Sequence, residues 1–420
     1  MSALLIQHIT QIATPLGKRA LHGKDMGKLK VYGDGAIYIR DNVIQDIGTT
    51  REVTARLGDL TDITVINGAG KCVVPGFVDP HTHFLFGGSR PEEFIDRLSG
   101  VPYLELLNRG GGIRSTMQAT RQSTAEALYQ TGYGILQDMM RTGVTTVEGK
   151  SGYGLDLETE LKQLRIMKRL EADTPMTIKT TFLGAHAVPP EYDGRSDAYI
   201  DYLIQSVLPL VQAENLAAFC DVFCEAGVFT LNQSEKLLEA AASLGFKCKI
   251  HADEIHSTGG GGLAARLNAI SAEHLLAVSA DDLQALAASK TIAVLLPATA
   301  FCMRKPFAPA RKMIDSGCAV ALASDFNPGS CFTHSIALVL ALAVISMQMS
   351  VEEVLTALTL NAAAAVDCAD TIGSVEIGKK ADLLLLKYPD YRFLVYHTGM
   401  NIVEQVIKDG RLLNWSTGQQ

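Results

Sequence analysis

VVPGFVDPHTHFLFGG, residues 73–88, is the part of this chain that says most about its architecture. An apolar run, Val73–Asp79, leads directly into His81-Thr82-His83. Further short apolar runs along the chain also end in, or just before, a polar or charged residue. A parallel barrel gathers the C-terminal ends of its strands at one mouth, where such residues become neighbours. The stretch therefore predicts the first strand of a barrel whose functional site lies at that mouth.

Apolar runs alternate with helical patterns through the middle of the chain. The predicted strands are Val73–Asp79, Val144–Glu148, Ile178–Leu183, Phe219–Cys224, Lys247–Ile250, Ala269–Ala272, Ile292–Leu296 and Ala319–Ala323. The predicted helices include Thr124–Arg141, Leu157–Ala172, Asp197–Ala213, Leu231–Leu244, Ser279–Ala288 and Ala308–Asp315. This alternation predicts an α/β fold, a (β/α)₈ TIM-type barrel. A doubly wound open sheet is the alternative, but no glycine cluster has the G-x-G-x-x-G spacing of its early turn.

Both ends of the chain contain short β-like segments, and we expect that neither end folds alone. Near the N-terminus they are Leu4–Ile9, Ala36–Ile39, Val43–Ile47 and Asp62–Ile66; near the C-terminus they are Ala381–Lys387, Val403–Lys408 and Arg411–Leu413. Asp409-Gly410 between the last two predicts a tight hairpin turn. We therefore predict a small β-sandwich domain built from residues 1–70 and 371–420, and a barrel domain of residues 71–370.

Composition bounds the class of protein. The chain has 420 residues, 47% hydrophobic and 20% charged, with a formal net charge of −8, which is typical of a packed globular protein. No basic block stands out, so nucleic acid is not an expected partner. The apolar run Ile336–Ile345 is far shorter than the roughly 20 residues of a membrane helix, and we expect a buried helix there.

Cysteine usage and the N-terminus indicate the compartment. The eight cysteines are dispersed, without a C-x-x-C pair, and we expect them to be reduced and mostly buried. Gln7, His8 and Gln11 interrupt the first apolar stretch, which disfavours a signal peptide. These features predict a cytoplasmic protein with no membrane partner.

Three strand ends carry metal-ligand side chains. His81 and His83 alternate on one strand and so can face the same cavity. His251 follows the strand KCKI, and Asp325 follows the last strand. Asp325 alone is equally typical of a helix N-cap, but three imidazoles and a carboxylate at one mouth predict a metal site, and a metal there suggests hydrolysis. HADEIH, residues 251–256, is neither H-E-x-x-H nor H-x-x-E-H, which disfavours a helical zinc protease.

Other polar residues stand near the same mouth. His186 and His274 follow the third and sixth strands, where a neutral imidazole can polarise a carbonyl or relay a proton. Glu254 lies on the loop after His251. Glu225 ends the fourth strand and either touches a metal or anchors a supporting hydrogen bond. Arg90 belongs to the long connection of residues 80–142, which we expect to shape the pocket. No lysine ends the fourth strand, so a two-metal site bridged by a modified lysine is not predicted.

Nine stretches together resemble the amidohydrolase superfamily and, within it, the imidazolonepropionase family. They follow the family's order over nearly the whole chain: PGFVDPHTHFLFGGSRPEEF (75–94), GGGIRSTMQATRQ (110–122), EGKSGYGLDLETELK (148–162), TFLGAHAVPPEY (181–192), DVFCEAGVF (221–229), HADEIHSTGG (251–260), ISAEHL (270–275), LLPATAFCM (295–303) and SDFNPGS (324–330). H-x-H alone would indicate only the superfamily. Two small departures, Ser324 in place of a usual Thr and Glu273 in place of a usual Asp, lie beside the inferred ligands.

The resemblance implies hydrolysis of 4-imidazolone-5-propanoate to N-formimidoyl-L-glutamate. It implies one divalent ion per subunit, Zn²⁺ or Fe, held by His81, His83, His251 and Asp325. It places around the substrate Arg90, Tyr153, His186, Glu254, Asn327, Gly329 and Ser330. Asp325, Glu254 and His274 are then the candidates for moving protons, and Arg90 suits the propanoate carboxylate because a guanidinium grips it with two hydrogen bonds. Related enzymes are often homodimers.

Two rival functions use the same fold. An aminohydrolase of an N-heterocycle, such as a cytosine or guanine deaminase, also has a barrel, a single metal and a Glu three residues after a ligand His. It would release ammonia, whereas opening an imidazolone ring would not. A non-catalytic scaffold is the other rival, and the complete set of four ligand residues argues against it.

Overall fold

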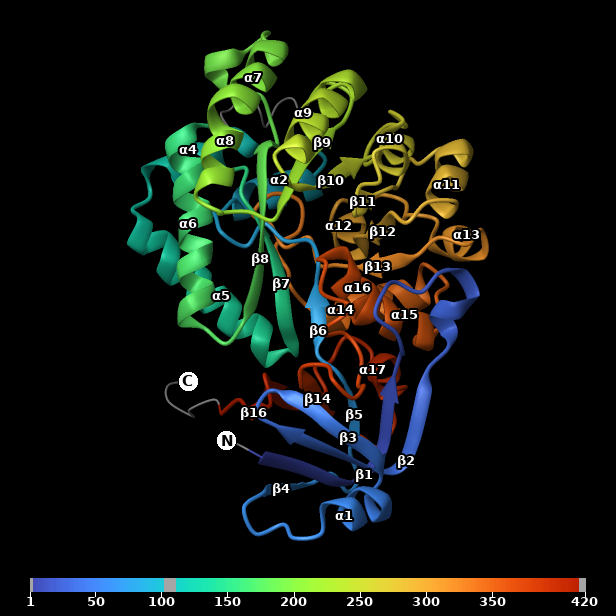
Figure 1. The fold of residues 1–420 in the computed structure, drawn as a ribbon. Coiled ribbons are helices and arrows are strands. Elements are labelled where there is room, and N and C mark those ends of the chain that lie inside the picture. The colour runs from blue at the N-terminus through green and yellow to red at the C-terminus, as the bar shows by residue number, and fades with distance from the viewer. Residues whose placement is uncertain (1–2, 102–110, 415–420) are drawn as a thin grey trace.

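The computed structural model describes residues 3–101 and 111–414, and it consists of a barrel above a curled sheet (Figure 1). Gly110, the first residue of the stretch GGGIRSTMQATRQ, lies outside the described residues. Together, the family-like sequence pattern and this arrangement make the chain a mixed α/β protein with a TIM-type barrel.

Eight parallel strands form the barrel, each paired with its neighbours in chain order. They are β6 (Phe77–Asp79), β7 (Val144–Lys150), β8 (Thr177–Ala185), β9 (Phe219–Cys224), β10 (Lys247–Ala252), β11 (Ser271–His274), β12 (Ile292–Leu295) and β13 (Val320–Leu322). The circle closes where Thr82, after β6, forms a parallel bridge with Phe326, after β13. This order confirms the predicted barrel, because a doubly wound sheet reverses its strand order partway across.

The predicted first strand, Val73–Asp79, is two strands in the structure. Its first half is β5 (Cys72–Pro75), which belongs to the lower sheet, and its second half is β6. Pro75 has no N–H to donate and Gly76 passes so close to the barrel that a Cβ there would lie 2.4 Å from Oγ1 of Thr145. The apolar pattern continues through this break, so the break does not interrupt the hydrophobic run.

Helices surround the barrel and connect its strands (Figure 1). Five predicted helices are present: α5 (Ala125–Arg141), α6 (Leu157–Asp173), α9 (Leu231–Ser243), α11 (Ala280–Ala287) and α13 (Ala310–Asp315). The predicted helix Asp197–Ala213 is divided into α7 (Ser196–Tyr202), a π-helical turn (Leu203–Val207) and α8 (Leu208–Ala213). The others are α2 (Pro91–Leu98), α4 (Ile113–Gln122), α10 (Gly260–Arg266), α12 (Pro297–Cys302), α14 (Ile336–Ile345), α15 (Val351–Leu358) and α16 (Leu360–Ala365). Along α14, as predicted, one side is buried in the core.

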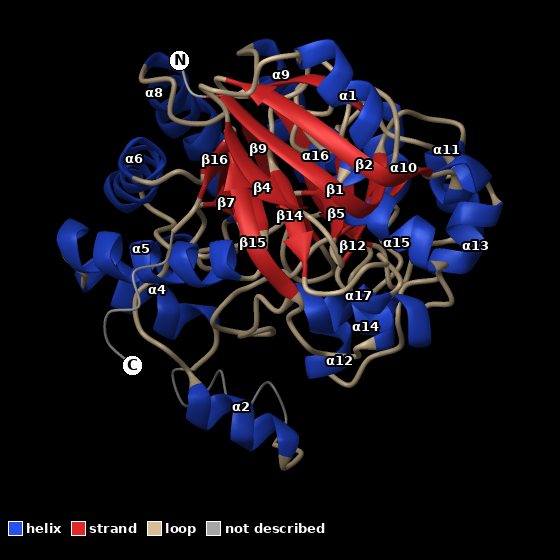
Figure 2. Cartoon of the chain, turned by 90° about the horizontal axis from the view of Figure 1, so that it is seen from below, coloured by secondary structure: helices blue, strands red, loops and turns tan. Residues whose placement is uncertain are grey.

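Strands from both ends of the chain form the lower sheet, in the order β16-β15-β14-β5-β1-β2-β3 with β4 paired to β1. Their bounds are β1 (Ala3–Thr14), β2 (Lys30–Arg40), β3 (Val43–Thr49), β4 (Thr64–Asn67), β14 (Leu383–Leu386), β15 (Val403–Lys408) and β16 (Arg411–Leu412). Helices α1 (Thr50–Leu57) and α17 (Phe393–Tyr396) accompany it. Figure 2 looks onto this sheet from below, where the N-terminal and C-terminal strands lie side by side. It is one continuous curled sheet, and the termini do build it together as predicted.

Buried lysines connect the sheet to the barrel. Lys408 in β15 donates to Oδ2 of Asp382 at 2.8 Å and to Oγ1 of Thr177 in barrel strand β8 at 3.0 Å. Lys379 donates to the carbonyl oxygens of Gly17, Ala369 and Ile372 at 2.6, 2.7 and 3.1 Å. Both ammonium groups therefore link segments that are far apart in the sequence.

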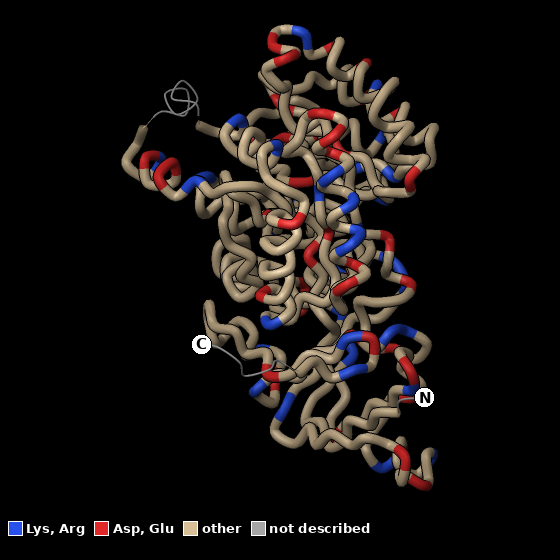
Figure 3. The backbone as a smooth tube through the Cα atoms, turned by 90° about the vertical axis from the view of Figure 1, so that its left-hand side faces the viewer, with Lys and Arg blue, Asp and Glu red and all other residues tan. Residues whose placement is uncertain are grey.

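The surface carries charges of both signs. Acidic and basic residues are interspersed along the tube in Figure 3, in line with the modest net charge. Helix α2 stands away from the body of the protein in Figure 2. Within residues 3–101 and 111–414, no helix combines the length and the apolar character needed to cross a bilayer.

Candidate active site

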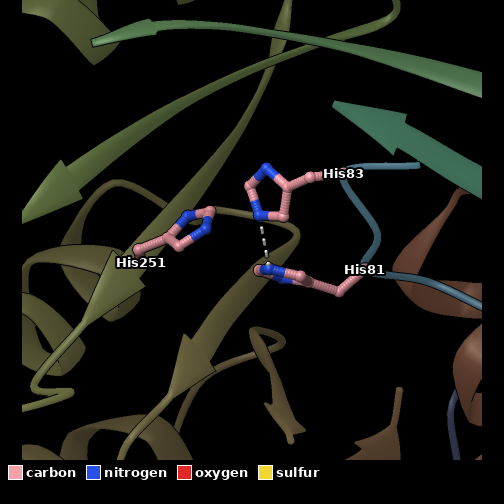
Figure 4. Close-up of side chains that lie close together, drawn as sticks. All are labelled: His81, His83 and His251. Atoms are coloured by element: carbon pink, nitrogen blue, oxygen red, sulfur yellow. Dashed lines mark hydrogen bonds between the residues drawn. The ribbon is translucent and has the colours of Figure 1, made fainter. Parts of the chain in front are cut away.

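Four side chains from three strand ends converge at the mouth of the barrel. Nε2 of His81 lies 3.3 Å from Nε2 of His83 and 3.3 Å from Oδ1 of Asp325. Nε2 of His83 lies 3.7 Å from the same carboxylate oxygen. The ring of His251 faces them from β10, with its centroid 4.6 Å from that of His81 (Figure 4). The structure thus brings together the four predicted metal ligands, all of them buried.

The donor atoms fit a metal ion better than they fit one another. One ligand atom from each of His81, His83 and His251 lies within 4.8 Å of the others, and the same holds for His81, His274 and Asp325. Nε2 of His251 is buried and has no hydrogen-bond partner among the described residues. Unprotonated imidazoles and a carboxylate are ligands that Zn²⁺ and Fe prefer. A divalent cation would satisfy these otherwise unpaired donors.

Backbone hydrogen bonds between the first and eighth strand ends hold the ligands together. The amide of His83 donates to the carbonyl of Phe326 at 2.9 Å, and the amide of Asp325 donates to the carbonyl of His81 at 3.1 Å. Asp325 has a φ of 53°, in the left-handed region, which turns its carboxylate into the barrel mouth. Residues 243 and 244 positions apart in the sequence are thereby fixed as neighbours through main-chain hydrogen bonds.

Asp79 supports this junction, although it was not among the residues predicted for the site. Its Oδ1 accepts from the amide of Ser324 at 3.0 Å, and its Oδ2 accepts from the Ser324 hydroxyl at 2.5 Å. This contact needs only a hydroxyl group, so Ser324 donates to Asp79 as a threonine at this position would. Burial raises the pKa of Asp79 to about 6. The sequence did contain a signal for this role, because an acidic residue in an apolar run, as Asp79 is, indicates a specific hydrogen-bond partner.

Two further carboxylates lie behind the histidines. Oε2 of Glu273 is 2.6 Å from Nδ1 of His81, and Oδ2 of Asp221 is 2.9 Å from Nδ1 of His251. Both carboxylates are fully buried. A carboxylate beside Nδ1 favours the imidazole form that presents a lone pair on Nε2, as a metal ligand requires. Glu273 therefore lies beside His81, a predicted ligand, in a position suited to orienting its ring.

A cavity of about 710 Å³ opens over the predicted metal ligands. It is lined by residues from several strand ends and loops, among them His83, Arg90, Tyr153, His186, His251, Glu254, His274, Asp325, Asn327, Gly329 and Ser330. The predicted substrate-contacting and catalytic residues thus share one pocket, although contact with a substrate stays a prediction. His81 lies beneath this lining, at the bottom of the site.

The loop SGYGL, residues 151–155, is held from below by Glu160 of α6. Oε1 of Glu160 accepts from the amides of Gly154 and Leu155, both at 2.9 Å, and Oε2 accepts from the amide of Gly152 at 3.0 Å. Tyr153, in the middle of this loop, is buried with its ring 5.8 Å from that of His83. Burial raises the pKa of Tyr153, which therefore remains a neutral phenol.

His186 stacks on His83, a predicted metal ligand, and takes its orientation from the same loop. Its ring lies 4.9 Å from that of His83 at an interplanar angle of 15°. Nδ1 lies 3.1 Å from the carbonyl oxygen of Gly152, a contact in which the ring N–H donates. Burial, together with the nearby His251, lowers the pKa of His186 to about 3. The ring is therefore neutral, with a lone pair on Nε2 available to a ligand.

Arg90 enters the pocket beside Gly329. Nη1 donates to Oε1 of Glu93 at 3.1 Å, while Nε is buried without a partner among the described residues. A Cβ at position 329 would lie 2.2 Å from Nη2 of Arg90. Only glycine leaves room for the guanidinium in its present position, so Gly329 serves the pocket by its small size.

Asn327 organises the loop after Asp325. Its Oδ1 accepts from the amides of Gly329 at 2.8 Å and Ser330 at 2.7 Å, and its Nδ2 donates to the carbonyl of Asp325 at 2.7 Å. The family resemblance implies that Asn327, Gly329 and Ser330 surround the substrate. They do line the cavity, but these two backbone amides and the Asn327 amide are already bonded to one another, so the loop contributes mainly shape.

Glu254 and His274 face each other across the pocket wall. Oε2 of Glu254 lies 3.7 Å from Nε2 of His274. Burial raises the pKa of Glu254 to about 8, with a further contribution from Asp325. Burial lowers the pKa of His274 to about 3. At neutral pH in the metal-free state, the carboxyl group therefore holds a proton and the imidazole does not.

Glu225, whose role the sequence left open, holds the loop that carries Glu254. Its Oε2 accepts from the amide of Ile255 at 2.9 Å, and its Oε1 lies 2.9 Å from Nδ1 of His256. Both oxygens are thus engaged with the loop, which favours the supporting role over metal contact. His256 is the exposed member of this pair.

Comparisons with known proteins show the family of this chain. A model of the amidohydrolase family matches residues 72–413. An imidazolonepropionase of Parabacteroides distasonis is 55% identical over 411 residues, which cover 98% of this chain and 99% of the relative. An imidazolonepropionase of Clostridium tetani is 51% identical over 410 residues, 98% of each chain.

Solved structures share the fold at much lower identity. E. coli guanine deaminase superimposes with a TM-score of 0.71 at 16% identity, covering 99% of this chain and 100% of the other. Atrazine chlorohydrolase TrzN from Arthrobacter aurescens TC1, complexed with zinc, superimposes with a TM-score of 0.69 at 14% identity, covering 98% and 95%. At these identities the likeness concerns the architecture alone.

Proposed function

The chain belongs to the amidohydrolase family and, within it, to the imidazolonepropionases, and from this premise we propose that it hydrolyses 4-imidazolone-5-propanoate to N-formimidoyl-L-glutamate. One water molecule is consumed: its oxygen joins the ring carbonyl carbon, the cyclic amide C–N bond breaks, and the ring nitrogen gains a proton. The observation that carries the proposal is the identity of 55% over 98% of the chain with an imidazolonepropionase.

A divalent metal ion belongs to this site, and we propose Zn²⁺ or Fe held by His81, His83, His251 and Asp325. When bound, such an ion supplies Lewis acidity for the carbonyl and makes a water molecule acidic enough to attack near neutral pH. Support comes from the converging donor atoms and from the unpaired Nε2 of His251.

Asp325, Glu254 and His274 are proposed to handle the protons. Oδ2 of Asp325 is fixed by the Thr299 hydroxyl at 2.6 Å, so Oδ1 is the oxygen that faces the histidines. The carboxylate can accept a proton from the attacking water. Glu254 has a raised pKa and lines the same pocket, which suits it to hold a proton and pass it to the departing ring nitrogen. His274 stays neutral and orients the groups between them.

The remaining pocket residues are proposed to bind the substrate. Arg90 grips the propanoate carboxylate, for which its unpaired Nε and its position at the cavity wall are suited. The lone pair on Nε2 of His186 accepts from a ring N–H, because Nδ1 is already used by Gly152. Tyr153 packs beside the ring, and the loop of Asn327, Gly329 and Ser330 shapes the space around the tail.

The cysteines indicate the cellular compartment of the protein. All eight are free thiols, and all but Cys302 are buried, as the sequence predicted. We therefore also propose a reducing, cytoplasmic environment for the enzyme.

The test is an assay of the metal-loaded protein with 4-imidazolone-5-propanoate. We expect the imidazolone absorbance to disappear without release of ammonia, with either Zn²⁺ or Fe²⁺ in the site. Stoichiometric ammonia would favour the deaminase alternative. An unchanged absorbance with metal present would contradict the proposed reaction.

A further inference from the structure

Two buried lysines lie beneath the candidate metal ligands, and the reaction described above does not use them. Lys150 ends β7 and Lys249 lies in β10, and both side chains are 0% exposed. Three carboxylates surround them, Glu148, Asp221 and Glu273, which are also 0% exposed. With all five groups ionised, this layer of the barrel interior carries two positive and three negative charges.

Lys150 is the centre of this layer. Its Nζ lies 3.0 Å from Oε1 of Glu148, 2.8 Å from Oδ2 of Asp221 and 3.0 Å from Oε2 of Glu273. The ammonium group donates hydrogen bonds to Glu148 and Asp221 and forms an ion pair with Glu273. Lys249 takes the other side, 3.1 Å from Oε2 of Glu148 and 3.2 Å from Oε1 of Glu273.

The oxygen atoms that Lys150 holds are the same ones that face the ligand histidines. Oδ2 of Asp221 lies 2.8 Å from Lys150 and 2.9 Å from Nδ1 of His251. Oε2 of Glu273 lies 3.0 Å from Lys150 and 2.6 Å from Nδ1 of His81. One ammonium group therefore fixes the position of both carboxylate oxygens that orient the two imidazoles.

A carboxylate oxygen this close to Nδ1 favours the imidazole form that keeps its proton on Nδ1 and directs Nε2 toward the metal position.

We propose that Lys150 is a positioning residue of the metal centre, which locks His81 and His251 in their metal-binding orientation through Glu273 and Asp221. This inference rests on the metal site proposed above. A purely structural role is a poor explanation, since buried ion pairs add little net stability compared with apolar side chains of the same size. The charged layer lies directly under the ligands, where orientation matters.

The test compares Lys150→Met with Lys408→Met in the full-length protein. Lys408 is a matched control, because it is equally buried and also pairs with a carboxylate, Asp382 at 2.8 Å, but at the junction with the lower sheet. Both proteins are stripped of metal and titrated with Co²⁺ in competition with a chelator, and the visible spectrum is recorded. For Lys150→Met we expect an affinity about 10- to 100-fold weaker and a shifted visible band. For Lys408→Met we expect the affinity and band of the unmodified chain.

Each result decides the question. Unchanged Co²⁺ affinity and spectrum in Lys150→Met would overturn the inference while leaving the proposed reaction intact. Failure of the unmodified chain to bind Co²⁺ would overturn the metal site and this inference together. If Lys150→Met does not fold, Lys150→Gln, whose amide can still donate to one carboxylate, is measured instead. If Lys150→Gln also fails to fold while Lys408→Met folds, Lys150 serves folding and the inference is wrong.

Discussion

Arg90 and Gly329 share a space that admits no extra atom, and this makes Gly329→Ala an informative change. The added methyl group would meet Nη2 of Arg90 at 2.2 Å. The guanidinium is the end of a flexible side chain, so the fold accommodates the change by moving it. The displaced guanidinium loses charge-assisted hydrogen bonds to the substrate carboxylate, which contribute about 1.5–3 kcal/mol to binding. We therefore predict a KM about 10- to 100-fold higher, with kcat much less affected. Steady-state kinetics with 4-imidazolone-5-propanoate measure both.

Gly134→Ala is the control for this prediction. Gly134 lies in helix α5, and a Cβ there meets no atom within 4 Å. Its kinetics should equal those of the unmodified chain. The assignment of Arg90 to the carboxylate tail would be wrong if Gly329→Ala moved the guanidinium, as seen in a crystal structure, and KM stayed the same.

Glu254 gives the metal-free protein a characteristic pH dependence. Its pKa is raised from 4.5 to about 8 on folding, chiefly by burial. The folded chain therefore binds this proton more tightly than the unfolded chain, and the group costs stability as pH rises between these two values, with the full cost above about pH 8. We predict that Glu254→Gln raises the Tm of the metal-free protein increasingly from about pH 6 to about pH 9. Thermal scans at a series of pH values measure the difference.

An exposed glutamate distinguishes this effect from a general loss of negative charge. Glu239 lies on the surface of helix α9. Glu239→Gln should shift Tm by a small amount that does not depend on pH in this range. A Tm difference for Glu254→Gln that is equally flat would show that Glu254 is ionised throughout, and its role as a proton donor to the ring nitrogen would lose its support.

The SGYGL loop depends on the first turns of α6, and Glu160→Gln tests this dependence. The carboxylate accepts three loop amides, and an amide group in its place must turn an NH₂ toward some of these donors. Leaving buried donors unpaired costs about 1–3 kcal/mol each. We predict a lower free energy of unfolding and, because Tyr153 and the partner of His186 lie on the loop, a lower kcat/KM. Denaturant unfolding and steady-state kinetics give the two quantities.

Metal content separates a loop effect from damage to the metal centre. It should remain unchanged in Glu160→Gln, because Glu160 touches none of the ligand histidines. Glu158→Gln, on the exposed face of the same helix turn, should alter neither stability nor kinetics beyond a few tenths of a kcal/mol. Equal behaviour of the two variants would mean that the loop holds its shape without Glu160.

The strands show where sequence patterns succeed and where they fail. The predicted positions of the barrel strands hold, but several strands continue further: β7 runs to Lys150 and β10 to Ala252. A strand predicted from the hydrophobic pattern ends at the first charged residue. In this barrel, however, the charged residues Glu148 and Lys150 are themselves buried inside it. Pairing between Lys150 and carboxylates from other strands cannot be deduced from spacing along one strand.

The position of the candidate site could be predicted from the order of strands and polar residues along the chain. Ligand residues follow their strands directly, so the barrel mouth brings His81, His251 and Asp325 together wherever the intervening helices end. Asp79, Glu160 and Glu225 were missed or left open because each acts on a partner that only the fold supplies. The division of Val73–Asp79 between two sheets was missed because an apolar run has the same pattern whether it is buried in one sheet or in two.

Strand β14 explains how the two halves of the molecule become one. Its sequence, Leu383–Leu386, has four leucines in succession, and all are buried. Leu383 and Leu385 belong to the core of the lower sheet, whereas Leu384 and Leu386 pack with the barrel core. A strand buried on both faces requires such an uninterrupted apolar run. The lower sheet and the barrel therefore share one layer of side chains.

This shared layer predicts a single unfolding transition. Leu384→Ala on the barrel side and Leu385→Ala on the sheet side should each destabilise the protein by about 2–5 kcal/mol. If the two halves unfold together, both substitutions lower the Tm of one shared transition. In each variant, the far-ultraviolet circular dichroism signal and the visible spectrum of bound Co²⁺ are then lost at the same temperature. Ile377→Ala, at a side chain that is 60% exposed, serves as the control and should change Tm little. Loss of the sheet signal before release of Co²⁺ in Leu385→Ala, with the second transition unmoved, would contradict the prediction, because the barrel would then be stable without the sheet beneath it.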